Sequence, residues 1–295
     1  MQDFGFLLIN KPVGLTSFQI VKKIRAITNI KKIGHTGTLD PFASGLLPIC
    51  VGKATRLAQF LLSDKKEYRV KAKFGMQTDT GDITGKTVQE KEFKPIEETE
   101  FLEKIPQILN IKEQIPPKYS AININGKRAY ELARNNVEFS IPTRNIKIFS
   151  FELSTLNLPF FEYVTTVSKG TYIRTLSEQI ASLFGEIAVT TELLRSKIGA
   201  LVIQNSVEIS ELTRENWRSF LVPVEQVLTN FPTITLNSEK SQDFIFGKRF
   251  YYEFTNQEFV NIVSENTDYL GLAEIKEKII HPRIVLGRYV LRVSK

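Results

Sequence analysis

The sequence is poor in the residues that build disulfides and zinc centres. Its 295 residues include one cysteine, two histidines, two methionines and one tryptophan. The single cysteine, Cys50, cannot form an internal disulfide, which fits a reducing compartment such as the cytoplasm. Together with His35 and His281 it supplies too few ligands for a Cys/His zinc site. Counting alone leaves a metal site made of carboxylates open.

The sequence also lacks long hydrophobic runs. No stretch approaches the roughly 20 apolar residues that cross a bilayer as a helix. The first residues, MQDFGFLLINKPVG, carry no basic segment ahead of a six-residue apolar run, so we expect no signal peptide and no membrane association. Ordinary numbers of Gly (16) and Pro (12), with 11% aromatic residues, exclude the collagen-like and disordered classes.

Basic residues exceed acidic ones only in the first third of the chain. Residues 1–86 hold 14 Lys and Arg against 6 Asp and Glu, whereas residues 87–295 hold 25 against 26; the net charge of the chain is +7. A concentrated basic region predicts a polyanionic partner, and composition does not distinguish RNA, DNA and an acidic membrane surface.

Hydrophobic periodicity predicts an α+β fold with two domains. Apolar patterns predict strands at 5–9, 46–52, 68–74, 145–153 and 160–168, and helices at 18–27, 97–109, 128–136 and 171–184. Because these elements do not alternate regularly, we expect a mixed or antiparallel sheet flanked by helices and loops rather than repeated βαβ units. A change to short strands predicts a domain boundary near 225–232.

One of the seven aspartates, Asp40, stands in the glycine-rich segment GHTGTLDPFASG. Glycines permit positive φ and close backbone approach, and Pro41 restricts Asp40 to an extended conformation. A carboxylate in such a loop suits a nucleophile or general base that acts on a polyanionic substrate. From the residues alone, the more common structure is an Asx-turn or helix cap.

The segment around Asp40 also carries a resemblance. GHTGTLDPFASGLLPICVGKATR resembles the catalytic-loop signature of the TruB family, the stand-alone bacterial tRNA pseudouridine synthases that act on uridine 55 in the T-arm. Four further segments resemble that family's blocks, in the same order: KPVGLTS (11–17), KEYRVKAKFGMQTDTGDITG (66–85), PPKYSAININGKRAYELAR (116–134) and VSKGTYIRTL (167–176). Five ordered blocks outweigh the turn interpretation of Asp40.

The resemblance implies an isomerase that detaches uracil from C1′ of the ribose, turns it and reattaches it through C5. Asp40 is then the catalytic carboxylate. It abstracts the 2′ proton, adds to C1′ or adds to the uracil ring, and the sequence does not choose among these three. Because nothing is oxidised and no group is transferred in, the resemblance implies no cofactor and no metal.

Two further catalytic residues are implied by the resemblance. Tyr68 matches an active-site tyrosine, whose ring stacks on the extruded uracil and whose hydroxyl serves in deprotonation at C5. Arg174 matches the arginine that pairs with the catalytic aspartate and holds it ionised. Without homology, Tyr68 is a packing residue and Arg174 forms an exposed ion pair with Glu178. Tyr172 is expected to line the same pocket.

The resemblance also implies residues that contact the RNA. Leu193 matches an apolar residue against the flipped base, although a core leucine is the plain alternative. His35 matches a histidine that fills the gap left by flipped nucleotides. Lys11 is expected near the substrate and as a buttress of the Asp40 loop. An insertion at about 110–140 resembles a T-loop clamp, with cations suited to phosphates: Lys118, Lys127 and Arg128.

These matches predict a pseudouridine synthase fold in a catalytic domain, 1–230, and a small, mostly β, PUA-like RNA-binding domain, 231–295. We expect a cytoplasmic monomer that binds the tRNA T-arm without a protein partner and assists tRNA folding. We also expect the basic excess of residues 1–86 to face phosphates in the catalytic cleft. Two departures from the family pattern, at 179–181 and at Leu194, put local helix packing and an RNA contact in doubt.

Two alternatives accompany the enzyme hypothesis. A non-catalytic RNA-binding or RNA-folding protein would not need Asp40, Tyr68 and Arg174 together. A guide-RNA-dependent relative that modifies ribosomal RNA is disfavoured by the PPKYSA segment, which resembles the stand-alone type.

Overall fold

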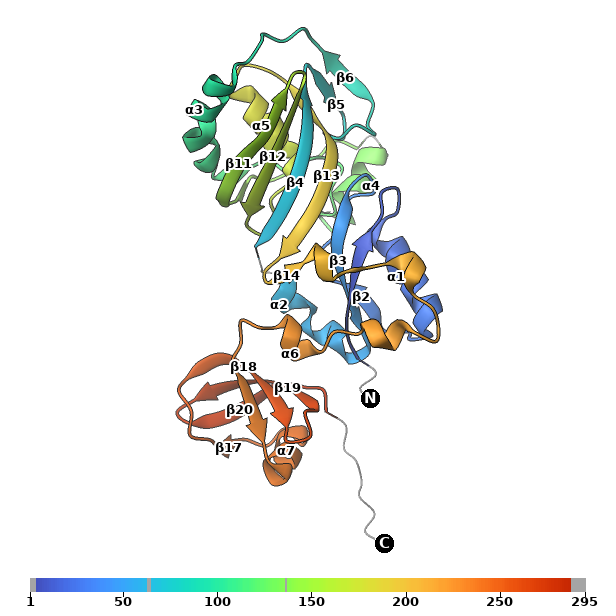
Figure 1. Cartoon of the computed structure of the whole chain (residues 1–295), viewed down its shortest axis with the longest axis vertical. Helices are drawn as coiled ribbons and strands as arrows, with labels where there is room; N and C mark the ends of the chain where they lie inside the picture. Colours follow the sequence, from blue (N-terminus) through green and yellow to red (C-terminus); the bar gives the residue numbers. More distant parts are fainter. Residues whose placement is uncertain (1–3, 63–64, 136, 288–295) are drawn as a thin grey trace.

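The computed structural model describes residues 4–62, 65–135 and 137–287. Within them the largest element is a nine-stranded mixed sheet in the order β11-β12-β4-β13-β3-β1-β15, with β2 beside β3 and β14 beside β13 (Figure 1). Its strands are β1 (Gly5–Lys11), β2 (Ile33–His35), β3 (Ser44–Val51), β4 (Lys66–Phe74), β11 (Ile148–Asn157), β12 (Phe160–Val167), β13 (Ala188–Ile198), β14 (Leu201–Val202) and β15 (Val207–Glu208).

Helices cover one face of the β11–β13 part of this sheet. Helix α3 (Glu98–Leu109) packs on β11, and α5 (Ile173–Ser182) packs on β13 (Figure 1). The fully buried Leu176 and Ile180 lie one turn apart on α5, as its helical periodicity predicts. Helix α1 (Ser17–Thr28) packs beside β2 and begins with a capping box formed by Thr16 and Gln19.

The remaining elements are short. The helices are η1 (Gly52–Leu57), α2 (Ala58–Leu62), α4 (Ala129–Arg134), η2 (Ile203–Asn205), η3 (Ile209–Glu211), η4 (Trp217–Phe220), α6 (Val224–Val227) and α7 (Ser238–Ile245). Three two-stranded ribbons pair β5 (Met76–Thr78) with β6 (Thr87–Glu90), β7 (Glu113–Gln114) with β10 (Arg144–Asn145), and β8 (Asn123–Ile124) with β9 (Lys127–Arg128). The β8–β9 ribbon lies in the predicted insertion, about 110–140, whereas the β7–β10 ribbon pairs its start with residues just after it.

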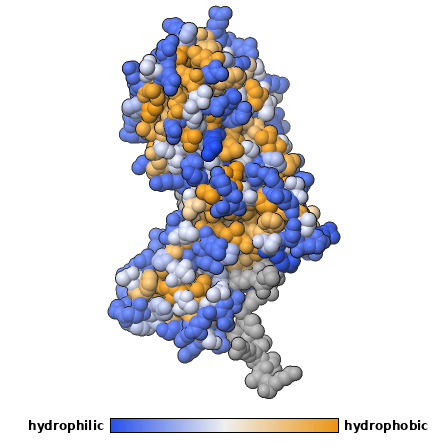
Figure 2. Space-filling model, viewed as in Figure 1, coloured by the Kyte–Doolittle hydropathy of each residue, from blue (hydrophilic) through white to orange (hydrophobic). Residues whose placement is uncertain are grey.

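Strand β4 separates a buried face from a wet one. Tyr68 and the apolar residues at alternate positions after it are buried, whereas Arg69, Lys71 and Lys73 point to the other face, as the two-residue period of a strand requires. There, Lys71 Nζ lies 3.1 Å from Glu162 Oε1 of β12 and 3.9 Å from Glu192 Oε1 of β13. Figure 2 shows hydrophilic residues among hydrophobic ones over the lobe that holds this sheet.

A second sheet forms the C-terminal lobe (Figure 1). Its strands, in the order β16-β18-β19-β20-β17, are β16 (Thr233–Leu236), β18 (Gln257–Ser264), β19 (Tyr269–Lys276), β20 (Ile279–Val285) and β17 (Phe250–Tyr251). This lobe has an apolar core of its own and shares another apolar cluster with β1, β3 and η1. Lys53 Nζ and Arg56 Nη1 of η1 each donate to a C-terminal carbonyl, Leu286 O and Val285 O, both at 2.7 Å.

The α+β prediction is confirmed. The central strand β13 (Ala188–Ile198) was not among the predicted strands, and the other differences are local. The strand predicted at 145–153 runs from Ile148 to Asn157, because pairing with β12 extends it beyond its own apolar pattern. The helix predicted at 128–136 is shorter, Ala129–Arg134, and residue 136 lies outside the described residues, as do the last eight residues of the segment 231–295.

Candidate active site

Asp40 lies in the loop between β2 and β3, and the start of α1 supports that loop. Ser17 Oγ donates to Leu39 O at 3.1 Å and accepts from Leu39 N at 2.9 Å. Gly14 N donates to Pro41 O at 2.7 Å. The two residues that flank Asp40 are therefore fixed from the opposite side of the loop, while 35% of the Asp40 side chain remains accessible. The carboxylate is thus both positioned and reachable.

Lys11, at the end of β1, is part of this support rather than a surface for substrate. Its side chain is fully buried, and its ammonium donates to Pro12 O at 2.8 Å, Leu15 O at 2.7 Å and Pro41 O at 3.5 Å. Burial lowers the pKa of Lys11 to about 8, against the opposing effect of the Asp40 carboxylate. The expectation that Lys11 contacts substrate is wrong, because its donors are occupied within the loop; its role as a buttress fits the geometry.

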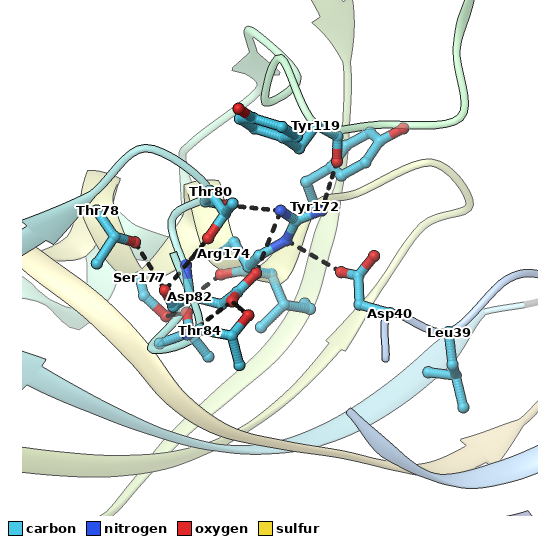
Figure 3. A network of polar contacts seen from close by, with 12 residues as sticks. Leu39, Asp40, Thr78, Thr80, Asp82, Thr84, Tyr119, Tyr172, Arg174 and Ser177 are labelled. Carbon is cyan, nitrogen blue, oxygen red and sulfur yellow. Dashed lines mark hydrogen bonds and ion pairs between the residues drawn. The ribbon is translucent and has the colours of Figure 1, made fainter. Parts of the chain in front are cut away.

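Arg174 joins the loop to α5. Its Nε lies 3.0 Å from Asp40 Oδ2, and its Nη1 lies 3.5 Å from Asp82 Oδ2 (Figure 3). Nη1 also donates to Thr80 O at 2.5 Å and Nη2 to Tyr119 O at 3.1 Å. The side chain is almost fully buried. A guanidinium held by four oxygens from three separate segments has one orientation, so it fixes the direction of the Asp40 carboxylate.

The second carboxylate, Asp82, escaped the sequence analysis. It is 5% exposed, and its Oδ1 accepts from Thr84 N at 3.0 Å and from Thr84 Oγ1 at 2.5 Å. The segment around it reads as a polar turn, and only the fold brings it under Arg174. The exposed pair of Arg174 with Glu178, considered as an alternative, is replaced by these buried contacts.

The charges around Asp40 act in opposite directions. Burial raises the pKa of the Asp40 carboxyl, and the nearby Asp82 carboxylate raises it further. The guanidinium of Arg174 and the ammonium of Lys11 lower it, with burial the larger influence. The pKa of Asp40 therefore lies above the ordinary value of an aspartate.

Tyr68 and Leu193 lie on the buried face of the sheet, on neighbouring strands, and each is 7% exposed. Tyr68 is paired directly across the β4–β13 ladder with Arg195, so the two side chains lie next to each other on the buried face of the sheet. Tyr172 forms the N-cap of α5, where its N–H donates to Gln114 Oε1 at 2.9 Å. Burial raises the pKa of Tyr172, and the charges of Asp40 and Arg174 also act on it. Tyr172 therefore belongs to the Asp40 cluster. Tyr68 lies beside Arg195, which donates to Gly37 O of the Asp40 loop.

His35 ends β2, five residues before Asp40. It is half-buried, and burial together with the Arg195 charge lowers its pKa. Its Nδ1 is buried and has no hydrogen-bond partner among the described residues. The ring is therefore neutral near pH 7, with one ring nitrogen unused by the protein.

The cations of the insertion lie on its surface. Lys118, Lys127 and Arg128 are exposed, the last two on the β8–β9 ribbon. The base of the insertion closes over a cavity of about 1050 Å³ whose wall includes Arg174, Tyr119 and the end of β5. Of the predicted clamp residues, Lys118 thus lines the same cavity as Arg174, whereas Lys127 and Arg128 lie outside its wall.

Across residues 4–62, 65–135 and 137–287, no group of three or more His, Cys, Asp and Glu side chains could hold a metal ion. Over the same ranges, no helix is both long enough and apolar enough to cross a membrane.

Solved structures share this architecture. An H/ACA RNP bound to a substrate RNA containing 2′-deoxyuridine superposes with a TM-score of 0.72 at 20% identity, over 97% of this chain and 86% of that one. A Cbf5–Nop10–Gar1 complex gives a TM-score of 0.70 at 22% identity, over 97% and 84%. At these identities the likeness establishes the fold.

Sequence relatives give the class of the protein. A family model described as "TruB family pseudouridylate synthase (N terminal domain)" matches residues 25–173. The tRNA pseudouridine synthase B of Clostridium tetani is 42% identical over 79% of this chain and 81% of its own length. That of Synechocystis is 35% identical over 96% and 100%.

Fold and relatives together define a pseudouridylate synthase, an isomerase that acts on uridine in RNA. The family model covers Asp40, Asp82 and Tyr172 of the polar cluster and ends one residue before Arg174. The chain belongs to the TruB family.

Proposed function

We propose that this protein isomerises uridine 55 in the T-arm of tRNA to pseudouridine, as the names of its relatives and the five sequence blocks indicate. The observation that carries the proposal is the 3.0 Å contact of Arg174 Nε with Asp40 Oδ2, in a cluster whose carboxylate remains accessible. A protein that only binds RNA gains nothing from a buried arginine that orients an accessible carboxylate.

In the proposed reaction Asp40 acts as an anion. Abstraction of the 2′ proton, attack at C1′ and addition to the uracil ring all require the deprotonated carboxylate. Arg174 supplies the positive charge that stabilises this anion and leaves Oδ1 outside the ion pair. Asp82 holds the guanidinium from the opposite side, so the arginine cannot turn away from Asp40.

The target base is proposed to leave its stack and enter the space between the Asp40 loop and β4. Tyr68 and Leu193 offer an aromatic and an apolar surface there, and Tyr172 lies at the start of α5. Extrusion of a base costs a few kcal/mol, which such contacts offset. The Tyr68 hydroxyl is assigned to removal of the C5 proton, and the neutral ring of His35 is assigned to the gap that the flipped nucleotide leaves.

RNA is proposed to be held outside this pocket by the insertion, residues about 110–140. Its exposed cations suit phosphates because each contact releases counterions from the RNA: Lys118, Lys127 and Arg128. Residues 1–230 are assigned to catalysis and residues 231–295 to a PUA-like RNA-binding domain. The PPKYSA segment supports a stand-alone enzyme without a protein partner, and the family resemblance supports a monomer. An isomerisation without redox change or group transfer needs no cofactor, and a tRNA substrate supports a cytoplasmic location.

The test is pseudouridine mapping at single-nucleotide resolution on total tRNA from cells with and without the protein. Loss of the T-arm pseudouridine, restored by the purified protein acting on a T-arm stem-loop, is the expected result. Unchanged tRNA together with an inert purified protein would refute the proposal. Activity on ribosomal RNA alone would favour the guide-dependent alternative.

A further inference from the structure

Arg195, on β13, is a buried cation without an acidic partner. It is 1% exposed, and it forms no ion pair with a carboxylate in the part of the chain that the structure describes. An isolated buried charge is strongly unfavourable unless hydrogen bonds compensate for its lost hydration. The contacts of this guanidinium therefore explain why it is tolerated and what it does.

Those contacts lead to the two halves of the proposed site. Arg195 Nε donates to Leu46 O at 2.9 Å, and Nη2 donates to Gly37 O at 3.1 Å. Gly37 stands three residues before Asp40, and Leu46 follows the loop on β3. Arg195 is also paired directly across the ladder with Tyr68 of β4, on the same buried face. One side chain thus contacts the Asp40 loop and lies beside the proposed catalytic tyrosine.

The backbone around Arg195 is adapted to this position. Arg195 pairs with Gly45 of β3 on one side and with Tyr68 of β4 on the other, so three strands meet at this residue. A Cβ at Gly45 would lie 2.4 Å from Arg195 O and 2.8 Å from Arg195 N, so only glycine allows the approach. Gly37, with φ of +110°, presents its carbonyl to Nη2 in a conformation that L residues rarely adopt.

We propose that Arg195 is a positioning residue that holds the Tyr68 hydroxyl at a fixed place relative to the Asp40 loop. It does not touch the reacting atoms. Its guanidinium sets the direction of the tyrosine hydroxyl while anchoring the loop that carries Asp40, so that both groups meet the uracil ring in one geometry. The inference rests on the proposed function, because it needs Tyr68 to take part in the reaction.

A double-mutant cycle tests this coupling. The four proteins are the unmodified chain, Arg195→Lys, Tyr68→Phe and the double variant, assayed for single-turnover pseudouridine formation on a T-arm stem-loop. We expect Arg195→Lys to lower the rate about 100-fold with RNA affinity unchanged, which is the scale for a mispositioned proton-transfer group. In the Tyr68→Phe background the same substitution should lower the rate by only about threefold, because the hydroxyl that it positions is absent.

A role confined to the loop gives a different result. Displacement of the Asp40 loop harms the reaction whether or not the Tyr68 hydroxyl is present, so equal losses in both backgrounds would overturn the inference and leave the proposed function intact. An unmodified protein without activity, or a Tyr68→Phe variant with full activity, would instead refute the role given to Tyr68, and the inference with it.

Two further variants keep the test decisive. Arg69→Lys makes the same change next to Tyr68 but on the wet face of β4. It should leave the single-turnover rate unaltered in both the unmodified and the Tyr68→Phe backgrounds. If Arg195→Lys fails to fold, as judged by melting temperature and RNA affinity, Arg195→Gln repeats the cycle with a neutral hydrogen-bonding side chain. Coupling of either variant to Tyr68 supports the inference, and additivity overturns it.

Discussion

Two ion pairs of nearly equal length lie on opposite faces of the β11–β13 region. Arg174 Nε is 3.0 Å from Asp40 Oδ2 and Lys71 Nζ is 3.1 Å from Glu162 Oε1, but their side chains are 4% and 35% exposed in the first pair and 32% and 43% in the second. The first cation is held by four oxygens, whereas the second lies near two solvent-exposed acids and over the ring of Phe160. Burial and the number of partners, not distance, separate an oriented site from a surface contact.

The same comparison corrects the interpretation of the basic N-terminal third. The positive charge of residues 1–86 was expected to form one wall of the cleft. Because strand residues alternate, Arg69, Lys71 and Lys73 face away from Tyr68, and Lys71 is already paired with Glu162. Part of that charge thus lies on the wet face of the sheet. The net charge of residues 1–86 therefore does not show which of its cations face the proposed site; the sheet face on which each cation lies does.

The largest effect is expected at the buried face. Asp40→Asn should lower the single-turnover rate by at least about 1000-fold, since the amide is neither nucleophile nor base. Affinity for the T-arm stem-loop, measured by filter binding, should stay within about threefold because phosphate contacts carry it. The control, Glu162→Gln, makes the same change of charge on the wet face and should keep the full rate. Near-normal turnover by Asp40→Asn would remove the assignment of Asp40.

A smaller but still large loss is expected when the charge of Arg174 is kept and its shape is changed. Arg174→Lys should lower the rate about 100-fold, because an ammonium cannot reach Asp40, Asp82 and the two carbonyls together. The matched change on the wet face, Lys71→Arg, should have no effect on turnover. Equal tolerance of the two substitutions would mean that burial does not distinguish these pairs.

The pH dependence sharpens the contrast further. The reaction needs anionic Asp40, so the rate should rise with pH through a pKa above the ordinary aspartate value. Asp82 is a like charge that raises this pKa, so Asp82→Asn should move the acid limb of the rate profile to lower pH. Glu192→Gln, which removes an acid from the wet face, should leave the limb in place. A limb that moves to higher pH in Asp82→Asn would contradict the electrostatic assignment.

Local sequence patterns predicted the helices and strands whose apolar residues repeat with a clear helical or strand period. The alternation around Tyr68 and the helical spacing of Leu176 and Ile180 survive in β4 and α5. The position of β13 between β4 and β3 was not predictable, since strand order depends on contacts between residues far apart in the chain. That order is what brings Arg195 to the Asp40 loop.

The residues of the candidate site likewise fall into those that the sequence indicated and those that only the structure shows. Asp40 and Arg174 were found by resemblance, and the structure brings them into contact. Asp82 was missed because its segment has the composition of a turn. Arg195 was not predicted as a site residue, because a single arginine in a strand does not indicate what it contacts. The two-residue period of a strand places Arg195 on the same buried face as Leu193.

The departures from the family pattern are also explained by position. Gln179 Oε1 accepts from Gln114 Nε2 at 3.0 Å, and Gln179 Nε2 donates to Glu113 O at 2.9 Å, so the altered helix residue ties α5 to the base of the insertion. Leu194 pairs with Arg69 on the wet face, where losing an arginine leaves Arg195 and its contacts intact.

The smallest effect is expected for the surface pair itself. Lys71→Met, Glu162→Gln and the double variant should each change the melting temperature by less than about 2 °C, because exposed ion pairs contribute little and salt screens them. Turnover of all three on the T-arm stem-loop should equal that of the unmodified protein. RNA affinity at low salt decides the remaining question: if Lys71→Met weakens binding while Glu162→Gln tightens it, the wet face of β4 contacts phosphates after all, and the division between a catalytic face and a structural face fails. Unchanged affinity in both variants would mean that Lys71 contacts only neighbouring strands of the sheet, and it would support the exposed cations of the insertion as the phosphate contacts.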